Sequence, residues 1–64
     1  MKTKEYEELE RQYRELLRDR DYYWTKYIRH SDNGNAKLTW HYFDLVSKTC
    51  EQIEEILDRM MAAK

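Results

Sequence analysis

The residues that could do chemistry are few, and their spacing does not suit a catalytic or metal site. His30, His41, Asp44 and Cys50 are the side chains best suited to bind a metal ion or to activate a nucleophile. His41 and Asp44 share one helical face, but His41 points away from the side that holds Cys50. The Glu-x-x-His pattern of carboxylate-bridged metal sites in bundles does not occur. The sequence therefore predicts no metal site, no cofactor and no enzymatic activity.

Aromatic residues form the most distinctive cluster. Positions 21–43 hold seven of the nine aromatic residues, around the only glycine. Aromatic side chains bury much area at small entropic cost and are typical of binding hot spots. We therefore predict contact with a partner protein through Tyr22, Trp24, Tyr27, Ile28, Leu38, Trp40, Tyr42 and Leu45.

A basic region offers an alternative surface. Arginines interleaved with tyrosines can hold RNA or single-stranded DNA through phosphate contacts and stacking. From Lys2 to His30 the eight positive side chains exceed the seven negative ones by only one, so acidic residues dilute this surface. The alternative prediction is nucleic-acid or anion binding through Arg11, Arg14, Arg18, Arg20, Lys26 and Arg29.

Two heptad patterns predict the helices that position these residues. Seam residues, meaning those that face the other helix, recur at alternating steps of three and four. Thr3 is the expected N-cap of a helix over about 4–30, and Asn35 that of a helix over about 36–62. The first predicted seam is Tyr6, Leu9, Tyr13, Leu16, Arg20, Tyr23, Tyr27 and His30. The second is Ala36, Thr39, Phe43, Val46, Cys50, Ile53, Leu57 and Met60.

The short link between the helices predicts how they pack. Residues 31–35, "SDNGN", form a turn because Asn33-Gly34 readily adopts positive φ. Two helices of matching length joined by about five residues fold back on each other. The sequence therefore predicts an all-α fold, an antiparallel two-helix hairpin that forms a single domain over residues 1–64.

Surplus apolar residues beside the seams predict a partner chain. Beside the first seam lie Leu17, Trp24 and Ile28, and beside the second lie Leu38, Tyr42, Leu45 and Ile56. One partner helix covers only one stripe of a helix, and so small a core seldom suffices alone. We therefore expect two hairpins to pair into a four-helix bundle homodimer, or one hairpin to dock on a target protein.

Arg20 occupies a seam position where the pattern calls for an apolar residue. One interpretation is a polar layer that sets the register and is satisfied by a carboxylate or by a hydroxyl such as Ser47. The other is an arginine that projects at the dimer surface and grips a carboxylate or phosphate. Asp19 and Asp21 leave both interpretations open.

Composition narrows the functional class. The net charge of −1 favours neither nucleic acid nor an acidic tail, and no apolar run is long enough to span a membrane. The single cysteine, Cys50, predicts a cytoplasmic location. We predict a regulator, inhibitor or adaptor that binds a target protein, of the small size that phages and other mobile elements encode.

The alternative function has an architectural parallel. A hairpin of this length is similar in architecture to the small plasmid proteins of the Rop type. That resemblance implies paired hairpins that hold RNA loops on one helical face. It rests on shape alone, and no residue role is carried over.

Overall fold

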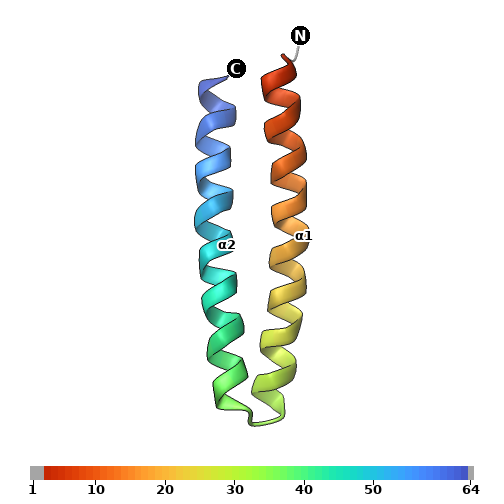
Figure 1. Cartoon of the computed structure of the whole chain (residues 1–64), viewed down its shortest axis with the longest axis vertical. Coiled ribbons are helices and arrows are strands. Elements are labelled where there is room, and N and C mark those ends of the chain that lie inside the picture. Colours follow the sequence, from red (N-terminus) through yellow and green to blue (C-terminus); the bar gives the residue numbers. More distant parts are fainter. Residues whose placement is uncertain (1–2, 64) are drawn as a thin grey trace.

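Two long helices make up the chain in the computed structural model, which describes residues 3–63. Helix α1 spans Lys4–Asp32 and helix α2 spans Ala36–Ala62. They lie side by side and antiparallel, joined by one tight turn (Figure 1). α1 runs two residues further than its predicted end at about residue 30. The predicted all-helical hairpin is confirmed.

Both helices begin at the caps that the sequence predicts. The Thr3 hydroxyl accepts a hydrogen bond from the backbone N–H of Tyr6 at 3.1 Å. The Asn35 side chain accepts one from the N–H of Leu38 at 3.2 Å. Each bond satisfies a donor that the first helical turn would otherwise leave without a partner.

Gly34 makes the reversal of the chain possible. Its φ of +73° lies in the left-handed region that residues with a Cβ rarely adopt. A Cβ added there would meet nothing within 4 Å, so backbone conformation, not lack of space, favours glycine.

The predicted seam of α1 agrees with its burial. Its eight residues are all buried or half-buried, and Leu9 is among the few core residues of the hairpin. The half-buried Arg20 lies among them. Because the positions follow one heptad pattern, α1 presents a single continuous stripe to α2.

The predicted seam of α2 is wrong at alternate positions. Ala36, Phe43 and Leu57 are exposed, and the half-buried Cys50 is less buried than its neighbour Thr49. The residues that face α1 lie one position earlier, and the observed seam of α2 is Thr39, Tyr42, Val46, Thr49, Ile53, Ile56 and Met60. Since successive residues are about 100° apart, this shift turns α2 by roughly 50°.

Thr49 explains why this seam is stable. It is 5% exposed, less than the core residues Leu9, Ile53 and Ile56. Its hydroxyl donates a hydrogen bond to the carbonyl of Leu45, one turn earlier, at 2.7 Å. The hydroxyl is thereby satisfied within its own helix, so a polar residue is tolerated between the helices.

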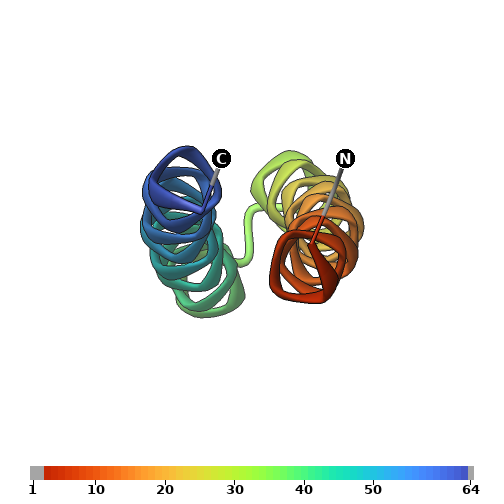
Figure 2. The same cartoon turned by 90° about the horizontal axis from the view of Figure 1, so that it is seen from above.

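The hairpin leaves both of its broad sides open. Viewed along its length, residues 3–63 form a pair of inclined helices with no third element over either side (Figure 2). The molecule measures 49 × 14 × 10 Å. Neither α1 nor α2 combines the length and apolarity that crossing a membrane demands.

Candidate protein-interaction surfaces

The rotation of α2 gathers large apolar side chains on one side of the hairpin. Leu17 and Trp24 are seven residues apart on α1, and Phe43, Cys50 and Leu57 repeat at the same interval on α2. A seven-residue interval keeps each set in a straight stripe along its helix. The two stripes therefore run beside the seam for much of its length.

Contacts between the helices show that the two stripes share a side. Trp24 of α1 lines a groove together with Val46 and Cys50 of α2. The ring of Tyr27 contacts both Trp24 and Phe43. We call this side the apolar face. It consists of both stripes and their outer neighbours: Leu17, Trp24, Ile28, Trp40, Phe43, Cys50, Leu57 and Met61.

Much of this apolar face is open to solvent. Its exposed fractions are 49% for Trp24, 43% for Ile28, 68% for Trp40, 44% for Phe43, 38% for Leu57 and 74% for Met61. Single exposed apolar side chains are common on protein surfaces, but several large ones on the same side of a molecule indicate an interaction surface.

A groove runs through the middle of the apolar face. This apolar groove has a volume of about 350 Å³ and is lined by Arg20, Asp21, Trp24, Val46 and Cys50. The Arg20 guanidinium lies 3.7 Å from the Asp21 carboxylate, and its side chain is 41% exposed. Arg20 thus keeps its stem in the seam and its charged end in the groove, a common arrangement for long cationic side chains.

Four aromatic rings form a chain at the turn end of the apolar face. Trp24 stacks on Tyr27, with ring centroids 5.3 Å apart. Tyr27 lies 5.9 Å from Phe43, and Phe43 meets Trp40 edge to face at 5.7 Å. These geometries are favourable for aromatic pairs. We call Trp24, Tyr27, Trp40 and Phe43 the tryptophan cluster.

A second aromatic chain lies on the other side of the seam. Tyr23 and Tyr42 meet across the two helices at 6.4 Å, and His30 stacks on Tyr42 at 5.4 Å. Tyr22 and His41 extend the chain outward by edge contacts with Tyr23 and Tyr42. We call Tyr22, Tyr23, His30, His41 and Tyr42 the tyrosine cluster.

The side of the tyrosine cluster carries a groove of different chemistry towards the open end of the hairpin. This polar groove has a volume of about 320 Å³. Leu16 and Ile56 form its floor from the seam. The remaining lining residues all have polar side chains, namely Gln12, Glu15, Asp19, Gln52 and Glu55.

The eight predicted partner-binding residues fall into two groups. Trp24, Tyr27, Ile28 and Trp40 belong to or adjoin the apolar face. Tyr22, Leu38, Tyr42 and Leu45 lie on the side of the tyrosine cluster, where Tyr42 and Leu45 are half-buried. The structure thus divides into two surfaces the residues that the sequence predicts as one.

Sequence reasoning missed four members of the apolar face on α2. The heptad pattern places Phe43, Cys50 and Leu57 in the seam, and Met61 in neither predicted surface. The signal that could have found them is the second alternating pattern in α2, through Tyr42, Thr49 and Ile56. This signal is weak, because it places the polar Thr49 in the seam where the pattern through Phe43 and Leu57 places Cys50.

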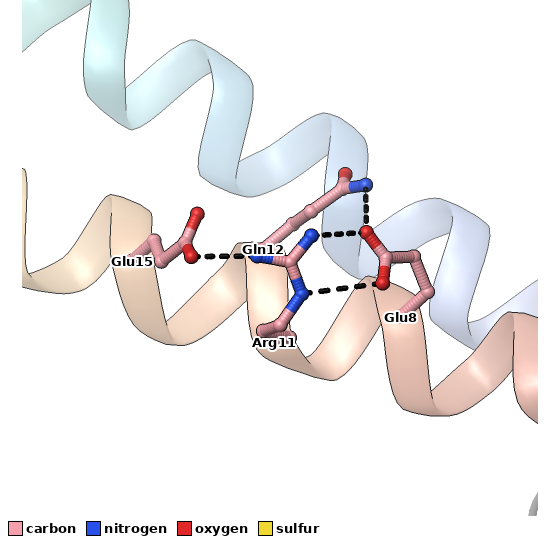
Figure 3. Close-up of polar contacts among 4 residues, drawn as sticks. All are labelled: Glu8, Arg11, Gln12 and Glu15. Atoms are coloured by element: carbon pink, nitrogen blue, oxygen red, sulfur yellow. Dashed lines mark hydrogen bonds and ion pairs between the residues drawn. The ribbon is translucent and has the colours of Figure 1, made fainter.

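Three of the basic residues of α1, namely Arg11, Arg14 and Arg20, contact acids of the same helix. Arg11 donates to both Glu8 and Glu15, the latter at 2.7 Å, and Gln12 also donates to Glu8 (Figure 3). The Arg11 hydrogen bond, followed by that of Gln12, holds the pKa of Glu8 below its ordinary value. The hydrogen bond to Glu8 in turn raises the pKa of Arg11. Arg14 pairs with Glu10 at 2.7 Å.

The six predicted nucleic-acid or anion contacts do not share one surface. Arg20 enters the apolar groove, whereas Lys26 lies over the ring of Tyr22 on the other side, 5.6 Å from its centroid. Arg11 and Arg18, seven residues apart, share the outer side of α1, and Arg29 is in its last turn. Phosphate tracking needs cations along one groove. The nucleic-acid alternative stays a prediction from sequence.

The metal-ligating residues considered from sequence remain apart. Within residues 3–63, no three His, Cys, Asp or Glu side chains gather closely enough to hold a metal ion. Cys50 is a free, half-buried thiol in the apolar groove.

Comparison with known proteins identifies no relative. No family model, no curated protein and no solved structure matches the chain. The geometry of the two sides of the hairpin is therefore the basis for its functional interpretation.

Proposed function

We propose that this chain is a small non-catalytic protein-interaction module, a regulator, inhibitor or adaptor of the cytoplasm. The observation that carries the proposal is the apolar face, with six large side chains between 38% and 74% exposed. If each is taken at about 200 Å² when fully exposed, they present on the order of 600 Å² of apolar surface. That is the upper end of what monomeric proteins show, where such patches are often functional.

The two sides suit two kinds of contact. The apolar face exposes large apolar side chains beside the charged pair of Arg20 and Asp21, so its burial against another protein chain that also meets these charges is favourable. The tyrosine cluster combines ring area with hydroxyl and imidazole groups that remain hydrated when free. Such a surface suits reversible contact with a target protein, made by Tyr22, Leu38, Tyr42 and Leu45.

Site-specific photocrosslinking in cells tests the proposal. A benzophenone amino acid at position 40 of the full chain should form a covalent adduct with a protein. Lys48 is the matched control, because its side chain is similarly open at 68% exposure but lies away from the apolar face. The same probe at position 48 should give little adduct. If position 40 forms no adduct, either with another protein or with a second copy, the proposal is wrong.

A further inference from the structure

We infer that a second copy of this chain covers the apolar face, and that the two hairpins pair with their turns at opposite ends. This inference rests on the proposed function, since it names the chain that contacts that face. It is carried by the self-complementarity of the α2 part of the face, in which each large exposed side chain has a matching one at a similar distance from a common centre.

The centre lies at Cys50 on α2. Phe43 and Leu57 stand seven residues before and seven after it, and Trp40 and Met61 stand ten before and eleven after. If α2 packs antiparallel to α2 of the second copy about Cys50, Phe43 meets Leu57 and Trp40 meets Met61, each contact occurring twice. Trp40 and Met61 have the largest exposed fractions among the large hydrophobic residues, 68% and 74%. This pairing buries both.

The charges of α1 are symmetric about the same height. The ring contacts of Tyr23 with Tyr42 and of Tyr27 with Phe43 fix the heights of the two helices, and they put Leu17 close to the height of Cys50. Arg14 and Asp21 lie three residues before and four residues after Leu17, on its outer edge.

Antiparallel packing of the two α1 helices about Leu17 therefore brings Arg14 opposite Asp21 of the second copy, twice. Both side chains are exposed, at 74% and 77%, and each would add this contact to the ion pair it makes within its own chain, Arg14 with Glu10 and Asp21 with Arg20. One axis thus satisfies the apolar pairs of α2 and the charged pairs of α1, which favours a dimer over an unrelated occupant.

The shape of the apolar face favours a dimer in which the turns of the two copies lie at opposite ends. The tryptophan cluster makes the turn end bulky, whereas Leu57 and Met61 are the apolar residues of the face towards the open end. Pairing the turns at opposite ends sets the bulky end of one copy on the slimmer end of the other. The roughly 600 Å² of apolar surface is also close to the approximately 800 Å² that each partner buries in a stable interface.

Distance measurement between spin labels tests the arrangement directly. The label is placed on Asn33→Cys, in the turn, in a full chain that also carries Cys50→Ser. Opposite turns predict a distance near the 49 Å length of the hairpin. Turns at the same end would give roughly 20 Å, about two helix spacings. A short distance, or a monomer at the concentration of the measurement, overturns the inference.

Crosslinking of the native cysteine is the second test. A short bismaleimide should convert most of the wild-type dimer to a covalent dimer, since the two Cys50 residues flank the axis. The matched control, Lys48→Cys with Cys50→Ser, should give little product.

Charge reversal is the third test. Either Arg14→Asp or Asp21→Arg alone should weaken the dimer severalfold, and the two reversals together should restore it. Restoration by Arg14→Glu with Glu54→Arg instead would indicate turns at the same end and overturn the inference.

The outcomes separate this inference from the function on which it rests. A monomer in sedimentation that still crosslinks from position 40 to another protein overturns the inference and leaves the proposed function standing. A monomer that crosslinks to nothing overturns both.

Discussion

The two grooves of the hairpin are similar in size and opposite in chemistry. The apolar groove, about 350 Å³, has Trp24, Val46 and Cys50 in its lining, whereas the polar groove, about 320 Å³, is edged by glutamines and carboxylates. Both flank the same seam. The functional difference therefore comes from which residues of α1 and α2 lie on each side of that seam.

The two aromatic clusters differ in the same way. The tryptophan cluster exposes indole and phenyl surface, and the tyrosine cluster exposes hydroxyl and imidazole groups. Water stabilises the second surface better than the first. A one-residue shift in the seam of α2 creates this contrast, because it moves Phe43 out to the apolar face and draws Tyr42 in.

The largest expected effect contrasts Ile56 with its neighbour Leu57. Ile56 is 8% exposed in the seam, so Ile56→Ala should lower the free energy of unfolding by about 2–4 kcal/mol at every protein concentration. Leu57→Ala should lower the free energy of unfolding by a smaller amount in a dilute sample. Its loss should grow with protein concentration, as association buries the apolar face. Urea denaturation followed by circular dichroism, at two concentrations a hundredfold apart, measures both. Equal losses for the two variants in dilute solution would contradict the observed seam.

A smaller effect is expected from Arg20, the charge in the apolar groove. Its ion pair with Asp21 is long at 3.7 Å, so Arg20→Leu should raise the free energy of unfolding by about 1 kcal/mol through contact with Trp24 and Val46. Asp19→Leu, on the edge of the polar groove, should change it by less than about 0.5 kcal/mol. Thermal unfolding of dilute samples compares them. A destabilised Arg20→Leu protein would mean that the guanidinium supports the seam.

Substitutions at Thr49 should change the stability of the hairpin only modestly. Thr49→Val keeps the shape of the side chain and removes a hydroxyl that bonds only within its helix, so stability should change by less than about 1 kcal/mol. Thr49→Ser keeps the hydroxyl and loses a buried methyl group, which should cost roughly 1 kcal/mol. Denaturation curves of the pair measure the difference. A large loss for the valine variant alone would assign the hydroxyl a partner on α1.

The smallest effect is a pH dependence at Glu8. Because hydrogen bonds from Arg11 and Gln12 lower its pKa in the folded chain, its stabilising contribution is complete above the ordinary, unfolded pKa of glutamate. That contribution is lost as the pH falls through the lowered folded pKa. It is small, since exposed pairs are screened by solvent.

The measurement for Glu8 is the difference in Tm between the wild type and Glu8→Gln as a function of pH. This difference should shrink towards zero as the pH falls, because Glu8 becomes protonated and loses its stabilising contribution. The other carboxylates titrate alike in both proteins, so their contributions cancel in the difference. Glu7→Gln serves as the matched control. A difference that grows with acidity would contradict the role of the bonds to Glu8.

The seam of α1 could be predicted from sequence, and that of α2 only in part. In α1, one set of positions carries the apolar and aromatic residues at heptad spacing, so only one rotation of the helix suits the partner. In α2, two sets overlap, through Phe43, Cys50 and Leu57 or through Tyr42, Thr49 and Ile56. Residue type alone favours the first set, because the hydrogen bond that makes Thr49 acceptable is visible only in three dimensions.

The candidate site, like the seam of α2, could be predicted from sequence only in part. That the aromatic residues exceed what two helices can bury follows from their number and from the helical repeat. Which of them share a surface depends on the rotation of α2. Trp24 and Phe43 lie on one side and Tyr22 and Tyr42 on the other, a division that no count of residues could supply.

The single turn at Gly34 gives the hairpin two unlike poles. The first turn of α1 and the last turn of α2 lie at the pole away from the turn and from both aromatic clusters (Figure 1). Any polypeptide fused to either end of the chain would leave from that pole, clear of both aromatic clusters. In the antiparallel dimer that we propose, the two such poles face outward along one rod. Two fused cargoes would then be held apart at the opposite tips of a rigid spacer.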